Sequence, residues 1–204
     1  MKLLLFDFDG VLVESLDVYY RIVSSALEKI NKPLTRGREE FLELFEGNFY
    51  ESLTQRGVDL NKFFAASSSM LADFKYNDMQ PVTAMKAVVE ELQKKNILLV
   101  ISSNSSPTIQ AALEQFKFNG SFQEVLGSDF LLSKKDKMLY AAKKYQIALT
   151  DIYYIGDTTG DIKESRAAGV KTVGVTWGWH SKEKMAQAKP DYLFDRPQEL
   201  LQLN

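Results

Sequence analysis

Two aspartates, Asp7 and Asp9, stand two residues apart after an apolar run at residues 3–8. If this run is a β-strand, residues i and i+2 point to the same side, so the two carboxylates lie close together. Like charges at that separation repel, and burying either one without a partner is costly. The pair therefore predicts a bound cation, a bound proton or a chemical role.

Polar side chains also gather where later apolar runs end. Ser103 and Asn104 stand at the end of the run at residues 97–103, and residues 152–155 are followed by Gly156-Asp157-Thr158-Thr159-Gly160-Asp161. A basic group, Lys134-Lys135-Asp136-Lys137, stands at the start of a predicted helix. Ligands of open α/β sheets bind outside the carboxyl ends of the strands, so we expect these residues to meet at one edge.

This set of residues suits a phosphate ester held beside a magnesium ion. Mg²⁺ prefers oxygen ligands, and the carboxylates of Asp7 and Asp157 with the backbone carbonyl of Asp9 are candidates. Ser103, Asn104 and a lysine offer N–H donors and positive charge to a phosphate. A carboxylate that faces the phosphorus can act as a nucleophile and form an aspartyl phosphate. The neighbouring carboxylate can then protonate the leaving oxygen and later activate water.

The elements that must position these residues alternate between strands and helices. Continuously apolar runs typical of buried parallel strands occupy residues 3–8, 97–103, 152–155 and 172–176, with further candidates at 124–128 and 191–194. Helices are predicted between them at residues 82–95, 107–116, 136–145 and 161–168. This alternation predicts an α/β fold with a doubly wound parallel sheet.

Residues 14–81 break the alternation. Apolar residues recur here at helical spacing, from Leu16 to Ile30, and further helices are expected at residues 39–45, 48–56 and 60–76. No strand pattern intervenes. We therefore predict two parts, an α/β core of residues 1–13 and 82–204 and an inserted all-helical cap of residues 14–81. The aromatic side chains of this cap are expected to form its core; among them are Phe41, Phe45, Phe49, Tyr50, Phe63, Phe64, Phe74 and Tyr76.

The motifs in this order resemble those of the haloacid dehalogenase superfamily. The resemblance rests on Asp7-Phe8-Asp9-Gly10-Val11-Leu12, Ser103-Asn104, the lysine group and Gly156–Asp161. Later stretches, including Val175-Thr176-Trp177-Gly178-Trp179, are similar to its phosphoglycolate-phosphatase-like branch. The resemblance implies a Rossmann-like core with a helical cap.

The resemblance also implies a role for each motif residue. Asp7 is the expected nucleophile and Asp9 the general acid/base. Ser103 is expected to hold the phosphoryl group with Asn104 beside it. Asp157 would bind Mg²⁺ with Asp7 and Asp9, while Gly10 and Asp161 would support the site. The superfamily's dehalogenases lack the second aspartate of the first motif, so Asp9 favours phosphate chemistry.

The identity of the phosphate-binding lysine stays open at this point. The family often has proline after this lysine, and no proline is present here. Lys134 is favoured and Lys135 follows closely, whereas Lys137 falls a turn further into the helix.

Composition excludes several other classes. The formal net charge is −2, so no basic field indicates nucleic acid as a partner. The chain has no cysteine, which rules out disulfides and thiolate sites. No membrane span and no signal peptide are predicted, and we expect a cytoplasmic protein. The only histidine, His180, is expected in a surface loop in a structural or solvent-facing role.

The leading hypothesis is a Mg²⁺-dependent phosphatase that acts on a small phosphorylated metabolite. A phosphomutase of the β-phosphoglucomutase type is the alternative, since it would use the same core residues and a helical cap. The order of the acidic residues argues against a signalling receiver, and a catalytically inactive binding protein is disfavoured because every motif residue is present. The sequence does not indicate which phosphate ester is the substrate or what the oligomeric state is.

Overall fold

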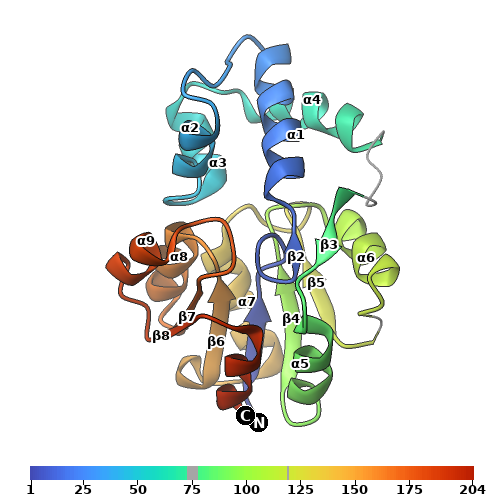
Figure 1. Cartoon of the computed structure of the whole chain (residues 1–204), viewed down its shortest axis with the longest axis vertical. Coiled ribbons are helices and arrows are strands. Elements are labelled where there is room, and N and C mark those ends of the chain that lie inside the picture. The colour runs from blue at the N-terminus through green and yellow to red at the C-terminus, as the bar shows by residue number, and fades with distance from the viewer. Residues whose placement is uncertain (73–77, 119) are drawn as a thin grey trace.

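A six-stranded sheet forms the larger part of the molecule in the computed structural model, which describes residues 1–72, 78–118 and 120–204 (Figure 1). All of its neighbouring strands are parallel, in the order β5-β4-β1-β6-β7-β8. The strands are β1 (Leu3–Phe6), β4 (Ile97–Ile101), β5 (Glu124–Leu126), β6 (Ile152–Gly156), β7 (Lys171–Val175) and β8 (Tyr192–Phe194). The predicted α/β class and parallel sheet are confirmed.

The central strand β1 shows why the apolar runs are continuous. Its neighbours β4 and β6 pair with it on both sides, and Leu3 lies opposite Ile97 and Ile152. Leu3 belongs to the hydrophobic cluster on one face of the sheet, and Leu4 to the cluster on the other. Both faces are therefore covered, as is usual for a parallel sheet.

Helices cover the two faces of the sheet. Residues of α5 (Met85–Leu92), α6 (Ser106–Gln115) and the 3₁₀ helix η3 (Pro197–Leu203) pack in the cluster that contains Leu4. Residues of α7 (Lys134–Tyr145) and α8 (Thr159–Ala168) pack in the cluster that contains Leu3. The chain also forms η2 (Leu149–Asp151) and a short helix, α9 (Lys182–Gln187), which the sequence pattern did not predict.

Four helices lie above the carboxyl ends of the strands (Figure 1). They are α1 (Leu16–Lys29), α2 (Arg38–Glu43), α3 (Phe49–Gln55) and α4 (Leu60–Ala72), and we call them the helical segment. They share a hydrophobic cluster rich in aromatic rings, to which the core adds Trp179. Phe74 and Tyr76, and the predicted end of the last helix, lie outside the described residues.

A two-stranded antiparallel ribbon joins the helical segment to the sheet (Figure 1). Its strands are β2 (Val13–Glu14) and β3 (Gln80–Pro81), with Val13 opposite Pro81. Two residues per strand are too few to produce a periodic pattern, so the ribbon could not be predicted from periodicity. We infer that the ribbon marks the junctions of the predicted cap with the core.

None of the described helices combines the length and the apolar composition that crossing a bilayer requires.

Candidate active site

Asp7 lies directly beyond the carboxyl end of the central strand. Its backbone N–H donates to the carbonyl of Ile155 at 2.8 Å, which extends the pairing of β1 with β6 by one residue. Asp9 follows in the turn after the strand, and both side chains are buried. The parallel sheet thus places two acidic side chains at the carboxyl end of its central strand.

Lys134 neutralises part of this acidic charge. Its ammonium Nζ lies 2.6 Å from Asp7 Oδ2 and 2.6 Å from Asp161 Oδ1. Burial alone would lower the pKa of Lys134, but the carboxylates of Asp161 and Asp7 raise it well above its ordinary value. Burial raises the pKa of Asp7 to about 7, although Lys134 acts in the opposite direction. Lys134 is therefore a charged lysine held against two acids.

Asp157 completes a group of three buried carboxylates. One ligand oxygen each from Asp7, Asp157 and Asp161 lies within 4.8 Å of the others. Oδ2 of Asp157 accepts the backbone N–H of Trp179 at 2.6 Å, while its Oδ1 is buried without a hydrogen-bond partner. Burial and the neighbouring carboxylates raise the pKa of Asp157 well above its ordinary value. A hard cation fits this oxygen-rich and under-satisfied group.

Two glycines leave room for the side chain of Asp157. A Cβ on Gly10 would lie 2.1 Å from Asp157 Oδ2, and one on Gly178 would lie 2.2 Å from Asp157 Cβ. Gly10 also has a φ of +75°, which side-chain-bearing residues rarely adopt. The predicted supporting position of Gly10 thus has a steric basis, and Gly178 shares it.

Asp161 is fixed by the start of α8. Thr158 and Asp161 form a capping box, in which Asp161 Oδ2 accepts the Thr158 backbone N–H at 3.0 Å and its hydroxyl at 2.7 Å. The other oxygen, Oδ1, faces Lys134. Burial alone would raise the pKa of Asp161, but Lys134 and these hydrogen bonds lower it. Asp161 thereby holds Lys134 in place.

Asp9 lines the same cavity as Asp7 and Asp157, and its side chain contacts the loop after β4. Its Oδ2 accepts a hydrogen bond from Asn104 Nδ2 at 3.0 Å, and Tyr19 of α1 donates its hydroxyl hydrogen to Asn104 Oδ1. Burial raises the pKa of Asp9 to about 6. Asp9 is therefore a carboxyl group that can carry a proton near neutral pH. Binding of a cation by its carbonyl stays a prediction.

Ser103 lines the same cavity as Asp7, Asp9, Lys134 and Asp157. Its backbone carbonyl accepts the hydroxyl hydrogen of Tyr50 at 2.5 Å. The loop after β4 is thus tied to the helical segment by two tyrosines, Tyr19 at Asn104 and Tyr50 at Ser103.

The three candidate lysines divide by their position on α7. Ser133 caps this helix, which begins at Lys134 rather than at the predicted residue 136. Lys134 and Lys137 therefore share its buried face, and Lys137 donates to the carbonyl of Ser102 at 2.7 Å. Lys135 points elsewhere: its side chain is 43% exposed and lies 4.0 Å from Asp136. This geometry favours Lys134, which the sequence also favoured, and a phosphate contact by Lys135 stays a prediction.

His180 is buried, so its expected place in an exposed loop is wrong. Its Nδ1 accepts the backbone N–H of Thr159 at 3.0 Å, and Nε2 lies 3.1 Å from the carbonyl of Leu42. Burial lowers its pKa, which keeps the ring neutral. The ring therefore connects the start of α8 with the helical segment, in line with the structural role that was expected.

Sequence reasoning missed several residues that hold the site. Glu164 Oε1 accepts the backbone N–H of Lys134 at 2.9 Å and the side chain of Asn48 at 3.1 Å, so it fixes the start of α7. The Trp179 ring lies among Tyr19, Phe41 and Phe45. Glu164 follows Asp161 by three residues, so their helical spacing was the available signal; no signal placed the ring of Trp179.

Known proteins are similar to this chain over almost its whole length. A family model described as haloacid dehalogenase-like hydrolase matches residues 4–175. A phosphoglycolate phosphatase from Haemophilus influenzae is 29% identical over 219 residues, which cover 98% of this chain and 96% of the relative. A phosphoglycolate phosphatase from Synechococcus elongatus is 27% identical and covers 99% of this chain and 96% of the relative.

Solved structures show the same fold. A predicted phosphoglycolate phosphatase from Haemophilus somnus is 27% identical, with a TM-score of 0.81, over 100% of this chain and 97% of that one. A predicted phosphatase from Clostridium acetobutylicum has a TM-score of 0.84 at 22% identity, over 98% and 96%. Since the family model spans the sheet from β1 to β7, the chain belongs to the haloacid dehalogenase-like hydrolases.

Proposed function

We propose that this hydrolase is a Mg²⁺-dependent phosphatase that acts on a small phosphorylated metabolite through a phosphorylated Asp7. The observation that carries the proposal is one cavity lined by Asp7, Asp9, Ser103, Lys134 and Asp157. It combines acids, a cation and a hydroxyl at the carboxyl edge of the sheet, where α/β folds bind ligands.

The proposed reaction has two transfers of the phosphoryl group. In the first, a carboxylate oxygen of Asp7 attacks the phosphorus, and Asp9 gives its proton to the departing oxygen of the substrate. In the second, Asp9 takes a proton from a water molecule that attacks the phosphorus, and Asp7 is released as a carboxylate. The pKa of Asp9, raised to about 6 by burial, suits an acid that becomes a base within one cycle.

Lys134 and Asp161 are proposed to serve the phosphoryl group together. The ammonium of Lys134 lies against Asp7, so it keeps the nucleophile ionised and can face the phosphate oxygens. Asp161 holds that ammonium from the other side. Ser103 and Asn104 are proposed to offer hydrogen bonds to the same phosphate.

The proposed cofactor is Mg²⁺, held by the carboxylates of Asp7 and Asp157 and the carbonyl of Asp9. The partnerless Oδ1 of Asp157 and the glycines packed around this side chain support the assignment. When bound, the ion supplies positive charge that offsets the charge of the phosphate oxygens.

The helical segment is proposed to act as a cap, with residues 14–81 as its extent. It contacts the loop after β4 through Tyr19 and Tyr50. It also contacts α8, where Gly160 donates its N–H to the carbonyl of Phe45 at 3.0 Å. A cap in this position would exclude water during phosphoryl transfer and select the leaving group.

A phosphate-release assay tests the proposal. The purified protein is incubated with a panel of phosphomonoesters, with Mg²⁺ and with excess chelator. We expect Mg²⁺-dependent release of inorganic phosphate from at least one ester. Release that is unaffected by the chelator would contradict the metal assignment, and an isomerised sugar phosphate that forms faster than free phosphate would indicate a phosphomutase.

A further inference from the structure

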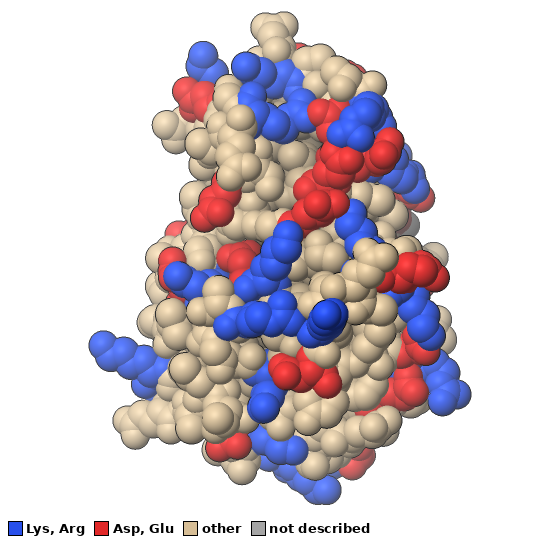
Figure 2. Space-filling view, turned by 90° about the vertical axis from the view of Figure 1, so that its left-hand side faces the viewer, with Lys and Arg blue, Asp and Glu red and all other residues tan. Residues whose placement is uncertain are grey.

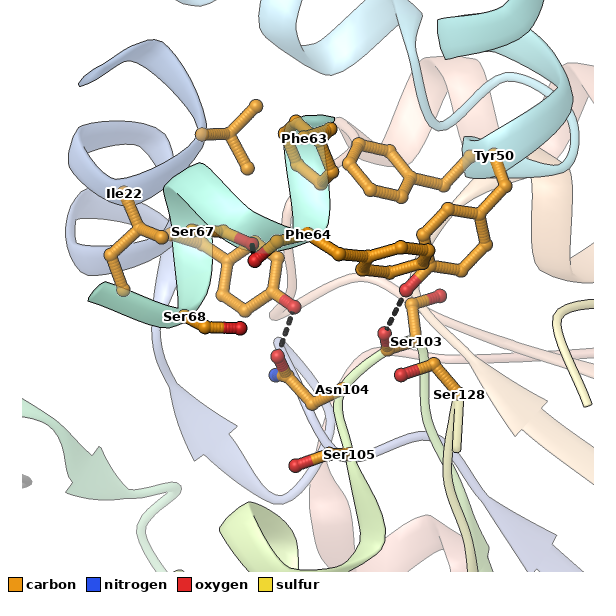
Figure 3. Close-up of a pocket in the computed structure, with 13 residues that line it drawn as sticks. Ile22, Tyr50, Phe63, Phe64, Ser67, Ser68, Ser103, Asn104, Ser105 and Ser128 are labelled. Atoms are coloured by element: carbon orange, nitrogen blue, oxygen red, sulfur yellow. Dashed lines mark hydrogen bonds between the residues drawn. The ribbon is translucent and has the colours of Figure 1, made fainter. Parts of the chain in front are cut away.

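A second cavity of about 110 Å³ opens between the helical segment and the loop after β4 (Figure 3). It shares Tyr19 and Ser103 with the cavity that contains Asp7, so the two cavities adjoin, and we call the second one the leaving-group cavity. Cavities for drug-sized ligands measure roughly 300–1,000 Å³. The space beyond the phosphate therefore suits a group of only a few heavy atoms.

The described lining of this leaving-group cavity carries no formally charged side chain. Figure 3 shows rings from the helical segment, including Tyr50, Phe63 and Phe64, above the polar residues of the core. Those polar residues are Ser103, Asn104, Ser105 and Ser128. The upper wall is therefore mainly aromatic and the lower wall is made of hydroxyl and amide groups.

The arginines of the helical segment are already engaged. Its four arginines each pair with a carboxylate, in the pairs Arg21–Asp78, Arg36–Glu43, Arg38–Asp17 and Arg56–Glu40. None of the four lines the leaving-group cavity as the structure describes it. Lys134, on the catalytic side, is shared between Asp7 and Asp161. A carboxylate on the leaving group would therefore meet no unpaired cation among these residues.

The two helix starts beside the cavity are also occupied. The backbone N–H of Ser106, at the start of α6, donates to Asp129 Oδ1 at 2.6 Å. The N–H groups of Tyr50 and Glu51, at the start of α3, both donate to Asn48 Oδ1 at 3.1 Å. Such N–H groups are a common means of binding a carboxylate without a cation. Here the chain's own side chains use them.

We propose that the substrate is a phosphate ester of a small, uncharged, hydroxylated molecule, such as a short polyol or a small sugar, rather than of a carboxylic acid. Hydroxyl groups of the leaving group would bond to Ser103, Ser105 and Ser128, and its C–H face would lie against the rings of Tyr50 and Phe64. Placing a carboxylate in the same space would remove its hydration without a compensating charge from the described lining residues. The inference rests on the proposed phosphatase function and narrows it.

Two esters of almost equal size separate these possibilities. 2-Phosphoglycolate carries a carboxylate at the position where 2-hydroxyethyl phosphate carries a hydroxymethyl group. We expect kcat/KM with Mg²⁺ to be about tenfold or more higher for 2-hydroxyethyl phosphate and glycerol 3-phosphate than for 2-phosphoglycolate. Equal or faster turnover of 2-phosphoglycolate would overturn the inference. Absence of hydrolysis of every ester, p-nitrophenyl phosphate included, would instead overturn the phosphatase function.

A charge added to the cavity wall provides an independent test. Ser68 is exposed and lines the cavity, so a longer side chain can be placed there without disturbing the interior. Ser68→Arg should raise the ratio of kcat/KM for 2-phosphoglycolate over 2-hydroxyethyl phosphate by about tenfold. Ser68→Gln, which is also long but neutral, is the matched control and should leave the ratio within about twofold. An unchanged ratio in Ser68→Arg would count against the inference.

Discussion

The catalytic edge of the sheet and the leaving-group cavity adjoin each other but differ in the chemistry of their side chains. At the catalytic edge, Asp7, Asp157, Asp161 and Lys134 bury formal charges within a few ångströms. The described wall of the leaving-group cavity consists of aromatic and aliphatic side chains, hydroxyls and an amide. The difference supports the proposal that one region performs the chemistry and the other selects the substrate by shape and hydrogen bonding.

Charged side chains on the surface occur as mixed acidic and basic groups (Figure 2). Acidic and basic side chains lie side by side over the face shown in Figure 2. The arginines of the helical segment belong to such surface pairs, with side chains mostly about half exposed. Exposed pairs of this kind contribute little to stability, so their effects should be the smallest of those tested below.

Removal of the nucleophile should have the largest effect. Asp7→Asn keeps the size of the side chain but removes its ability to form an acyl phosphate, so we expect kcat to fall by more than about 10³-fold. Circular dichroism and the melting temperature should show a folded protein. The exposed Asp136 offers the same substitution, and Asp136→Asn should retain near-normal kcat. Near-normal turnover by Asp7→Asn would refute the assignment of the nucleophile.

Loss of the buried cation should affect both activity and stability. Lys134→Ala leaves the buried carboxylates of Asp7 and Asp161 without their ion pair, so we expect the free energy of unfolding to fall by about 3 kcal/mol. Activity should fall by at least about a hundredfold. Lys135→Ala is the control, because its partly exposed side chain is absent from the site. Equal losses for the two variants in urea unfolding and in phosphate release would contradict the preference for Lys134 over Lys135 as the lysine of the site.

Truncation of an aromatic wall should change selectivity more than chemistry. The ring of Phe64 lines the leaving-group cavity and lies 5.4 Å from that of Tyr50. Phe64→Ala should lower kcat/KM for glycerol 3-phosphate by about tenfold, and that for methyl phosphate by less than about threefold. Phe130→Ala, at an exposed ring outside the cavity, should change neither value. A uniform loss on both esters would place Phe64 in a general structural role.

An ion pair of the helical segment should affect stability alone and depend on pH. Hydrogen bonds from the backbone N–H of Arg36 and from the Arg56 side chain lower the pKa of Glu40 to about 2. Glu40→Gln should therefore reduce the free energy of unfolding by about 1 kcal/mol at pH 7 without changing kcat.

The pH dependence of that loss follows from the direction of the shift. A lowered pKa in the folded state stabilises the fold above the ordinary pKa of 4.5, and this contribution disappears as pH falls toward about 2. The difference between wild type and Glu40→Gln should thus shrink below about pH 4.5. Glu39→Gln is a matched control at a more exposed carboxylate, and it should have little effect. A difference in the free energy of unfolding that grew as the pH fell would contradict the lowered pKa of Glu40.

Much of the fold was predictable because the parallel strands are buried on both faces. Continuous apolar runs marked all six strands of the sheet to within two or three residues, and the polar residues after β1, β4 and β6 indicated the edge where the site lies. The family motifs added a proposed role for each. Local patterns suffice where a strand end alone decides the position of a side chain.

Prediction was less accurate where position depended on a helix cap or on a contact between distant segments. The start of α7 at Lys134, two residues before the predicted residue 136, depended on the Ser133 cap. The burial of His180 depended on Leu42 of the helical segment, 138 positions away along the chain. Neither the cap geometry nor this long-range contact leaves a periodic signal in the sequence.

Chemical trapping of the phosphorylated residue tests the central proposal most directly. The Asp9→Asn variant should slow the attack of water, whereas p-nitrophenyl phosphate, whose leaving group needs no protonation, should still phosphorylate Asp7. A phosphorylated enzyme should therefore accumulate when the variant is mixed with this ester and Mg²⁺. Borohydride reduces an acyl phosphate to an alcohol, and peptide mass spectrometry then locates the modified residue. We predict a reduced side chain at Asp7 that appears only with substrate. Substrate-dependent reduction at another acid, or continued turnover with Asp7 unmodified, would contradict the account.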